Sequence, residues 1–355
     1  MTMVTSIAAP AFADAYGIAL YGTHYLDQGN ITVEVRGGQY YVNDVLDDDG
    51  PVIIKNHEDE SDTTSVSNTI TIHAEDGEAN VTLKDVDIVT NGEANKSGIT
   101  VKADKTKTAT ATVNVTLDNV TVDAREDASS EGATGGAGMT IQGNGVVNIE
   151  LDGKNELLAG DGHAGLEKNR TESVGSLNIN DSNEDGGSLT AIGGDGGAGI
   201  GGGKGDMGSG LYILNGTVNA YGKGGGAGIG GGDGAGAHMV GLNAGVPGVN
   251  DAYEPTVTAV GSEGAAGIGG GKGGRLTDAV LSSGTLTGTM ETLEYLQAHG
   301  AQTIVFTTSQ RTSSFQISDL LALADEGDVF YLTHTEANEP TLLVVTSDHT
   351  DLLEG

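Results

Sequence analysis

The chain has 355 residues, and its 60 glycines stand against five prolines, four phenylalanines and no tryptophan. So little bulky apolar material argues against a conventional globular core and favours closely stacked layers of backbone and small side chains. Fifty Asp and Glu against 16 Lys and Arg give a formal net charge of −34, which argues against nucleic acid and anionic membrane surfaces as partners. Neutral polysaccharides, or anionic glycans bridged by calcium, are compatible with this charge.

The first residues carry an export signature. Ala11, Phe12 and Ala13 form the small-x-small pattern of a signal-peptidase site, although no basic region precedes it. We interpret residues 1–13 as the remnant of a signal peptide, the alternative being a flexible Ala-rich end. Absence of cysteine excludes disulfides and thiolate metal sites, and no stretch approaches the roughly twenty apolar residues of a membrane span. A secreted or cell-surface protein without direct membrane insertion is expected.

Strand patterns begin near Ile31 and recur along the chain. The segment NVTLKDVDI from Asn80 and the segment NVTLDNVTV from Asn114 align position by position, and the same spacing then reaches Asn148. One strand pattern at a regular spacing indicates repeats that stack on one another.

A glycine-rich unit, AGIGGG or a looser form of it, marks each repeat in the middle of the chain. The full unit stands at 198–203, 227–232 and 266–271, and the looser forms stand at 97–99, 137–139 and 164–166. An alternating L-x-I strand follows each unit, and then a strand of the T-V-x-A type, as in TVNAYG from Thr217. Three strands per repeat, joined by turns of variable length, describe one coil of a β-helix.

In such a coil Val218 and Ala220 point into the core while Thr217 and Asn219 point outward, and each column stacks on its equivalent about 4.8 Å away in the next coil. Glycine suits the sharp corners, where the backbone adopts positive φ or touches another coil. The sequence therefore predicts an all-β protein, a right-handed parallel β-helix (solenoid) of about eight coils within residues 14–290.

The pattern changes in residues 291–355. Leu293 and Leu296 have helical spacing, and ISDLLALADEG reads as a short helix with Ser318 as its N-cap. The segments TIVFTT, DVFYLTHT and PTLLVVT read as strands. We expect this small α+β segment to cap the open end of the solenoid, and the alternative is that it begins a further domain.

One motif indicates a metal. Asp181, Asn183 and Asp185 precede Gly186 and match the first half of the D-x-[DN]-x-[DN]-G calcium loop. The twelfth position of the motif is Ile192 rather than a bidentate Glu, and the loop lies between two predicted strands. The motif therefore leaves two interpretations, Ca²⁺ as a structural ion held by these three side chains or an ordinary solvated turn.

Aromatic side chains are the candidates for carbohydrate binding, because a sugar ring stacks its apolar face on an aromatic ring. Tyr212, Tyr221 and Tyr253 fall in consecutive repeats, and we expect them to share a surface. The alternative is that each tyrosine simply covers part of the solenoid wall.

Evidence for catalysis is thin, and no catalytic residue is assigned. No Ser-His-Asp or metal-ligand spacing stands out. A calcium-dependent polysaccharide lyase would need an Arg base beside acids, and Arg170 lies in the repeat that also carries Asp181 and Asp185. Outward Thr-x-Thr columns also resemble the ice-binding faces of other β-solenoids, although Thr is an ordinary strand residue.

The AGIGGG unit joined to a T-V-x-A-x-G strand resembles Gly-rich repeats of large secreted surface proteins from Gram-positive gut and soil bacteria. It is also similar to the β-helical carbohydrate-binding family of clostridia. The resemblance covers about residues 95–290 and implies the fold and an extracellular location, but it carries over no binding residue. The leading hypothesis is a non-catalytic, adhesin-like β-helix that binds polysaccharide or host glycan. A polysaccharide lyase and a passive stalk of a larger adhesin are the alternatives.

Overall fold

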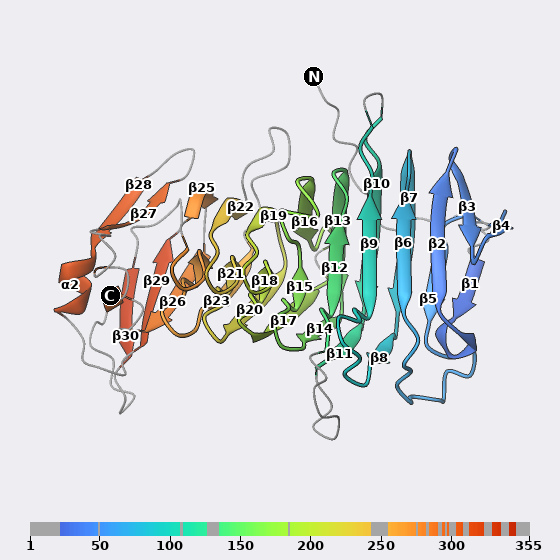
Figure 1. Cartoon of the computed structure of the whole chain (residues 1–355), viewed down its shortest axis with the longest axis horizontal. Helices are drawn as coiled ribbons and strands as arrows, with labels where there is room; N and C mark the ends of the chain where they lie inside the picture. The colour runs from blue at the N-terminus through green and yellow to red at the C-terminus, as the bar shows by residue number, and fades with distance from the viewer. Residues whose placement is uncertain are drawn as a thin grey trace.

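The computed structural model describes residues 22–48, 50–106, 109–125, 135–183, 185–242 and 255–274, and then 276–281, 284–289, 293–294, 297, 303–307, 312–322, 329–334 and 341–345. The proposed signal-peptide remnant and Tyr253 lie outside these residues. The described chain is almost entirely β structure, in three long sheets that the chain visits in turn. Figure 1 shows the strands side by side along the long axis of the molecule.

The first sheet contains the L-x-I strands, all of them parallel. Its order is β1 (Gly22–Tyr25), β5 (Val52–Lys55), β7 (Glu78–Lys84), β10 (Thr112–Asp118), β13 (Val146–Asp152), β16 (Ser176–Asn180), β19 (Gly208–Ile213), β22 (Ala237–Leu242) and β25 (Leu276–Leu281).

The second sheet contains the T-V-x-A strands. Its order is β8 (Asp87–Val89), β11 (Thr121–Ala124), β14 (Lys154–Ala159), β17 (Ser188–Asp195), β20 (Thr217–Lys223), β23 (Thr256–Val260), β26 (Gly284–Thr289), β29 (Val329–His334) and β30 (Thr341–Val345). The strands from β8 to β26 are parallel, whereas β29 and β30 are added antiparallel.

The third sheet contains the small-Gly-aliphatic units, and most of its strands are short. Its order is β4 (Val45–Asp47), β3 (Gln39–Val42), β2 (Ile31–Arg36), β6 (Ile70–Ala74), β9 (Ile99–Ala103), β12 (Met139–Gln142), β15 (Leu166–Glu167), β18 (Ile200–Gly201), β21 (Ile229–Gly230) and β24 (Ile268–Gly269). Three stacked, largely parallel sheets visited in rotation are consistent with a β-helix or solenoid.

The register of the first sheet confirms the predicted repeat spacing. Asn114 in β10 lies opposite Asn80 in β7 and opposite Asn148 in β13. Equivalent positions of successive repeats are therefore neighbours in space, as the alignment of the strand patterns predicted.

Alternation along β20 places the core as predicted. Val218 and Ala220 are fully buried, whereas Thr217 and Asn219 on the opposite side are half-buried. Because many strands of the three sheets repeat this alternation, the inward aliphatic side chains form one continuous core. Full burial of a Val side chain contributes about 1.5–3 kcal/mol, so the core depends on many small contributions.

The glycine-rich units form a two-residue strand followed by a turn. Ile229 stacks between Ile200 and Ile268, and all three are buried. Gly201 has φ +134°, and a Cβ there would collide with the backbone of Gly230 in the next coil. Glycine is needed at this corner for both the backbone conformation and the close approach of coils.

The two ends of the solenoid carry antiparallel additions. At the N-terminal end, β2, β3 and β4 form two successive hairpins at the edge of the third sheet. At the C-terminal end, β29 and β30 extend the second sheet beyond β26. A separate hairpin joins β27 (Thr303–Thr307) to β28 (Thr312–Gln316).

Short helical segments are also described, and Leu293, Glu294 and Gln297 are helical as the sequence predicted for this part of the chain. A 3₁₀-helix, η2, spans Leu26–Gln28, and a short helix, α2, spans Ile317–Leu321. The predicted N-cap was wrong, because Gln316 is the N-cap and Ser318 lies within the first turn of α2. Ile317 and Leu320 are buried, so helix entry follows the apolar residues rather than a hydroxyl cap. Among the described residues, no helix has the length and apolarity needed to cross a membrane.

Candidate functional site

A row of asparagine amides runs along the outer face of the first sheet. The Nδ2 of Asn114 donates to Oδ1 of Asn80 at 2.8 Å, and the Nδ2 of Asn148 donates to Oδ1 of Asn114 at 2.7 Å. Asn178 continues the row with a 2.7 Å bond to Asn148. Tyr212 takes the next position, opposite Asn178, and burial raises the pKa of its hydroxyl. Tyr212 therefore stands beside the last amide of a hydrogen-bonded ladder that ties neighbouring strands together.

Tyr221 lies in β20 of the second sheet, in an outward column of apolar side chains. Ile192 in β17 and Val260 in β23 are its neighbours in register, and all three side chains are half-buried. Leu158 in β14 lies next to Ile192 and continues the column, but it is buried, at 6% exposed. We call these four residues the outer apolar stripe.

Hydroxyl and amide side chains flank the outer apolar stripe. Two residues before each stripe residue of β17, β20 and β23, the outward positions are Thr190, Asn219 and Thr258. The result is a flat strip of sheet in which an apolar column runs beside a polar column, both with the spacing of the coils.

The structure does not bring the predicted tyrosines together. Tyr212 belongs to the first sheet and Tyr221 to the second, so they do not share an outer face. Sequence spacing placed them in consecutive repeats, whereas Tyr212 and Tyr221 lie in consecutive strands, β19 and β20, which face different sides of the molecule. Tyr253 lies outside the described residues.

The predicted calcium turn covers part of the outer face of the first sheet. Asp181 is 5% exposed, and its Oδ2 accepts a 3.1 Å hydrogen bond from the Gly187 amide. The Nδ2 of Asn183 donates to Oδ1 of Asp152 at 3.0 Å and lies 3.4 Å from Oδ2 of Asp185. The three predicted ligands thus take part in hydrogen bonds that shape the turn itself.

A buried carboxylate, Glu150, and a half-buried one, Asp152, lie beneath this turn. Glu150 is 2% exposed, and its Oε1 accepts bonds from the Ser182 amide at 2.5 Å and the Ser182 hydroxyl at 2.7 Å. Its Oε2 has no hydrogen-bond partner among the described residues. Burial raises the pKa of Glu150, and burial also raises the pKa of Asp152, whose charge Asp185 further disfavours. In the part of the chain described, no three His, Asp or Glu side chains are grouped as metal ligands.

One coil replaces the glycines of the repeat with polar residues. Glu167, Lys168 and Asn169 follow the looser unit 164–166, and Glu167 lies opposite Gly201 of the next coil. The Oε2 of Glu167 lies 3.0 Å from Nδ1 of His163, and Oε1 accepts a 3.1 Å bond from Asn169. The hydrogen bond to Glu167 raises the pKa of the His163 imidazole.

Lys168 is fully buried at this interruption. Its Nζ donates to the backbone carbonyl of Ser209 at 2.6 Å and to that of Ser173 at 3.3 Å. It makes no ion pair with any described residue, and burial lowers its pKa to about 8. Lys168 therefore fastens the segment 169–173 to β19 of the next coil.

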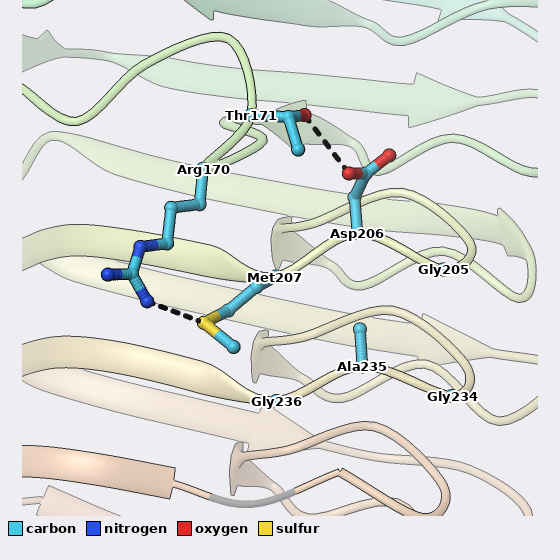
Figure 2. A pocket seen from close by; sticks show the side chains of 8 residues that line it. All are labelled: Arg170, Thr171, Gly205, Asp206, Met207, Gly234, Ala235 and Gly236. Atoms are coloured by element: carbon cyan, nitrogen blue, oxygen red, sulfur yellow. Dashed lines mark hydrogen bonds between the residues drawn. The ribbon is translucent and has the colours of Figure 1, made fainter.

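A groove lies beside the interruption, at the corner between the third and first sheets. Figure 2 shows Arg170 and Thr171 from one coil facing residues 205–207 of the next coil and 234–236 of the one after. The groove has a volume of about 510 Å³. The Nη1 of Arg170 lies 3.3 Å from Sδ of Met207, and the hydroxyl of Thr171 donates to Oδ1 of Asp206 at 3.1 Å.

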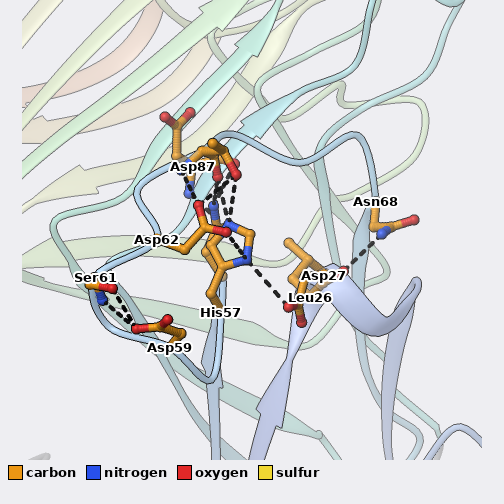
Figure 3. A network of polar contacts seen from close by, with 10 residues as sticks. Leu26, Asp27, His57, Asp59, Ser61, Asp62, Asn68 and Asp87 are labelled. Carbon is orange, nitrogen blue, oxygen red and sulfur yellow. Dashed lines mark hydrogen bonds and ion pairs between the residues drawn. The ribbon is translucent and has the colours of Figure 1, made fainter.

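A second polar network lies at the N-terminal end (Figure 3). The Nε2 of His57 lies 2.7 Å from the Thr64 carbonyl oxygen, and its Nδ1 lies 3.3 Å from Oδ2 of Asp27 in η2. The bond to Thr64, and then Asp27 and Asp62, raise the pKa of His57. The network joins η2 to the loop after β5, so its observed role is to hold the first coil.

Sequence reasoning missed the groove. It considered Arg170 only together with Asp181 and Asp185, whereas the structure places its guanidinium against Met207, beside Asp206. One signal was available, because Lys168 follows the looser unit 164–166 at the position that Val101 and Ile141 hold after the looser units 97–99 and 137–139. A charged residue at an inward aliphatic position marks a feature that stacking alone does not require.

Comparisons with protein-family models, curated proteins and solved structures found no match. The site is therefore interpreted from its own geometry.

Proposed function

We propose that this protein is an exported, non-catalytic surface β-helix, adhesin-like in use, that binds a neutral polysaccharide chain on the outer face of its second sheet. The observation that carries the proposal is the outer apolar stripe around Tyr221 beside the column of Thr190, Asn219 and Thr258. The proposal includes a right-handed winding, the hand of nearly all parallel crossovers, and about eight coils.

The chemistry of the strip matches that of a sugar chain. A pyranose ring has an apolar face, which suits Tyr221 and its aliphatic neighbours, and a rim of hydroxyls, which suits the flanking side chains. Ligand sites commonly combine apolar surface with a few placed polar groups. The net charge of −34 favours a neutral chain, because a polyanion would be repelled over the whole length of the molecule.

The test is a neutral glycan array followed by calorimetry of the strongest binder. Tyr221→Ala should weaken Kd about tenfold, equivalent to about 1.4 kcal/mol. Tyr212→Ala is the matched control, because it removes the same ring from a different sheet, and its Kd should change less than twofold. Silence across the array would reject glycan binding and leave the passive stalk, and loss of binding in the Tyr212 variant alone would move the site to the first sheet.

Catalysis is tested with the same neutral glycans and, for lyase activity, with uronate-containing glycans. A hydrolase would release new reducing ends, and a polysaccharide lyase, which removes the C5 proton next to a uronate carboxyl group, would release 4,5-unsaturated products. We expect neither from the wild-type protein over the time of a binding experiment, since the proposal requires no bond cleavage.

Calcium has a separate test. The sequence predicts Ca²⁺ at Asp181, Asn183 and Asp185, and a cation there would offset the buried charge of Glu150 and Asp152. A bound ion stabilises the folded state by mass action, so chelation should lower the melting temperature. An unchanged melting temperature after chelation removes calcium from the proposal without affecting glycan binding.

A further inference from the structure

The guanidinium of Arg170 is the unusual charge in this acidic chain. Arg36 pairs with Glu34 at 3.0 Å, and Arg125 pairs with Asp123 at 2.6 Å. Arg170, also described, forms no ion pair with a described residue, and its side chain donates only to the thioether of Met207. A thioether is a weak acceptor, so most of the five guanidinium donors of Arg170 are available to a ligand.

The groove gives this guanidinium a defined position. The backbone amide of Arg170 donates to the carbonyl of Met207 at 2.8 Å, which fixes Arg170 against the next coil. Behind it, the Nζ of buried Lys168 donates to the backbone carbonyls of Ser173 and Ser209. Ser173 follows Arg170 in the same turn, and Ser209 follows Met207 in β19 of the next coil. Arg170 therefore projects from an anchored turn rather than from a free loop.

The opposite side of the groove carries an acceptor and a flat floor. One oxygen of Asp206 accepts the Thr171 hydroxyl, which leaves its second oxygen for a ligand hydroxyl. The floor consists of the turn 234–236, which has only one methyl group as side-chain material. A guanidinium, a carboxylate and a smooth floor within about 510 Å³ suit a single sugar ring better than a peptide side chain.

We infer that the groove binds one carboxylated sugar residue, a single uronic acid unit of an otherwise neutral polysaccharide. The Arg170 fork pairs with the sugar carboxylate in two-point fashion, Asp206 accepts a sugar hydroxyl, and the floor contacts the ring. This inference rests on the proposed polysaccharide binding and extends it to a second subsite with different chemistry. Asp206 and Glu172 are negatively charged and lie close by, so they repel a ligand carboxylate. The carboxylate can therefore bind only in direct contact with the guanidinium of Arg170.

The experiment measures Kd by calorimetry in the presence of a chelator, so that calcium cannot bridge ligand and protein. The probes are otherwise neutral hexasaccharides that each carry a single galacturonate, glucuronate or mannuronate residue, with the methyl ester of each as its uncharged counterpart. We expect at least one free acid to bind and its methyl ester to bind at least tenfold more weakly. Arg170→Gln should weaken Kd for the free acid at least tenfold.

Arg125→Gln is the matched control, because it removes a guanidinium that already has a carboxylate partner, and it should change Kd less than twofold. Thermal unfolding of both variants checks that they remain folded. The inference is overturned if no hexasaccharide with a single uronate binds, if acid and ester bind equally, or if both arginine variants bind like the wild type.

Failure of this inference is distinguishable from failure of the proposed function. Neutral-glycan binding that depends on Tyr221, without uronate binding, rejects only the groove. Uronate binding that depends on Arg170, without any neutral-glycan binding, rejects only the strip on the second sheet.

Discussion

Replacing Lys168 with methionine tests whether the solenoid really encloses an uncompensated charge. Burial lowers the pKa of Lys168 from 10.5 to about 8. Below pH 8 the side chain is charged in both the folded and the unfolded state, and its burial destabilises the fold. Between pH 8 and 10.5 the folded protein releases the proton while the unfolded chain keeps it, so stability rises with pH. At 1.36 kcal/mol per pH unit, the gain is about 3 kcal/mol.

Methionine has a similar length and no titrating group, so Lys168→Met lacks this gain. The free energy of unfolding of the wild type, relative to that of the variant, should therefore rise by about 3 kcal/mol between pH 7 and pH 10.5. Urea unfolding followed by circular dichroism at several pH values measures the difference. A flat profile for Lys168→Met would refute the reasoning.

Three further predictions concern the corners and the buried acids. Gly201→Ala should lower the free energy of unfolding by about 3 kcal/mol or more, because the added Cβ meets backbone atoms at a residue with positive φ. Gly205→Ala, which has open space around the added Cβ, should lower it by about 1 kcal/mol. Equal shifts of the two variants in urea midpoint would count against the corner interpretation. Glu150→Gln should stabilise the protein at neutral pH, because burial raises the pKa of Glu150. The wild type therefore loses stability as pH rises from the unfolded pKa of this group to its higher folded pKa. A variant that is less stable than the wild type at pH 7 but equal to it at pH 4 would contradict this. The bond to Glu167 raises the pKa of His163, so its stabilisation is complete below the unfolded pKa and is lost as pH rises through the folded one, and Glu167→Gln should remove that dependence in melting curves measured from pH 5 to 8.

Much of the architecture was predictable because repeats encode their own neighbours. Asn80, Asn114 and Asn148 recur at one spacing, and stacking of equal coils then places them opposite one another. The Cβ clash at Gly201 similarly explains why the glycine pattern predicts corners without any knowledge of the rest of the chain. Handedness of winding and the number of coils remain predictions.

The candidate sites were less predictable, since they depend on which face each strand presents. Tyr212 and Tyr221 are nine positions apart yet belong to different sheets, because the turn at Asn215 and Gly216 carries the chain from β19 to β20. Periodicity of two identifies an outward side chain, but it does not say which of three outer faces receives it.

By itself, the sequence determined the strand periodicity, the stacking of like positions and the need for glycine at the corners, because each of these is a local property repeated from coil to coil. The tertiary structure alone decided that Lys168 is buried without an ion pair to a described residue, and that Arg170, Asp206 and the turn 234–236 line one groove. Those contacts join residues from successive coils across a corner. Their geometry depends on turn lengths and on the closeness of neighbouring backbones, neither of which a repeat pattern specifies.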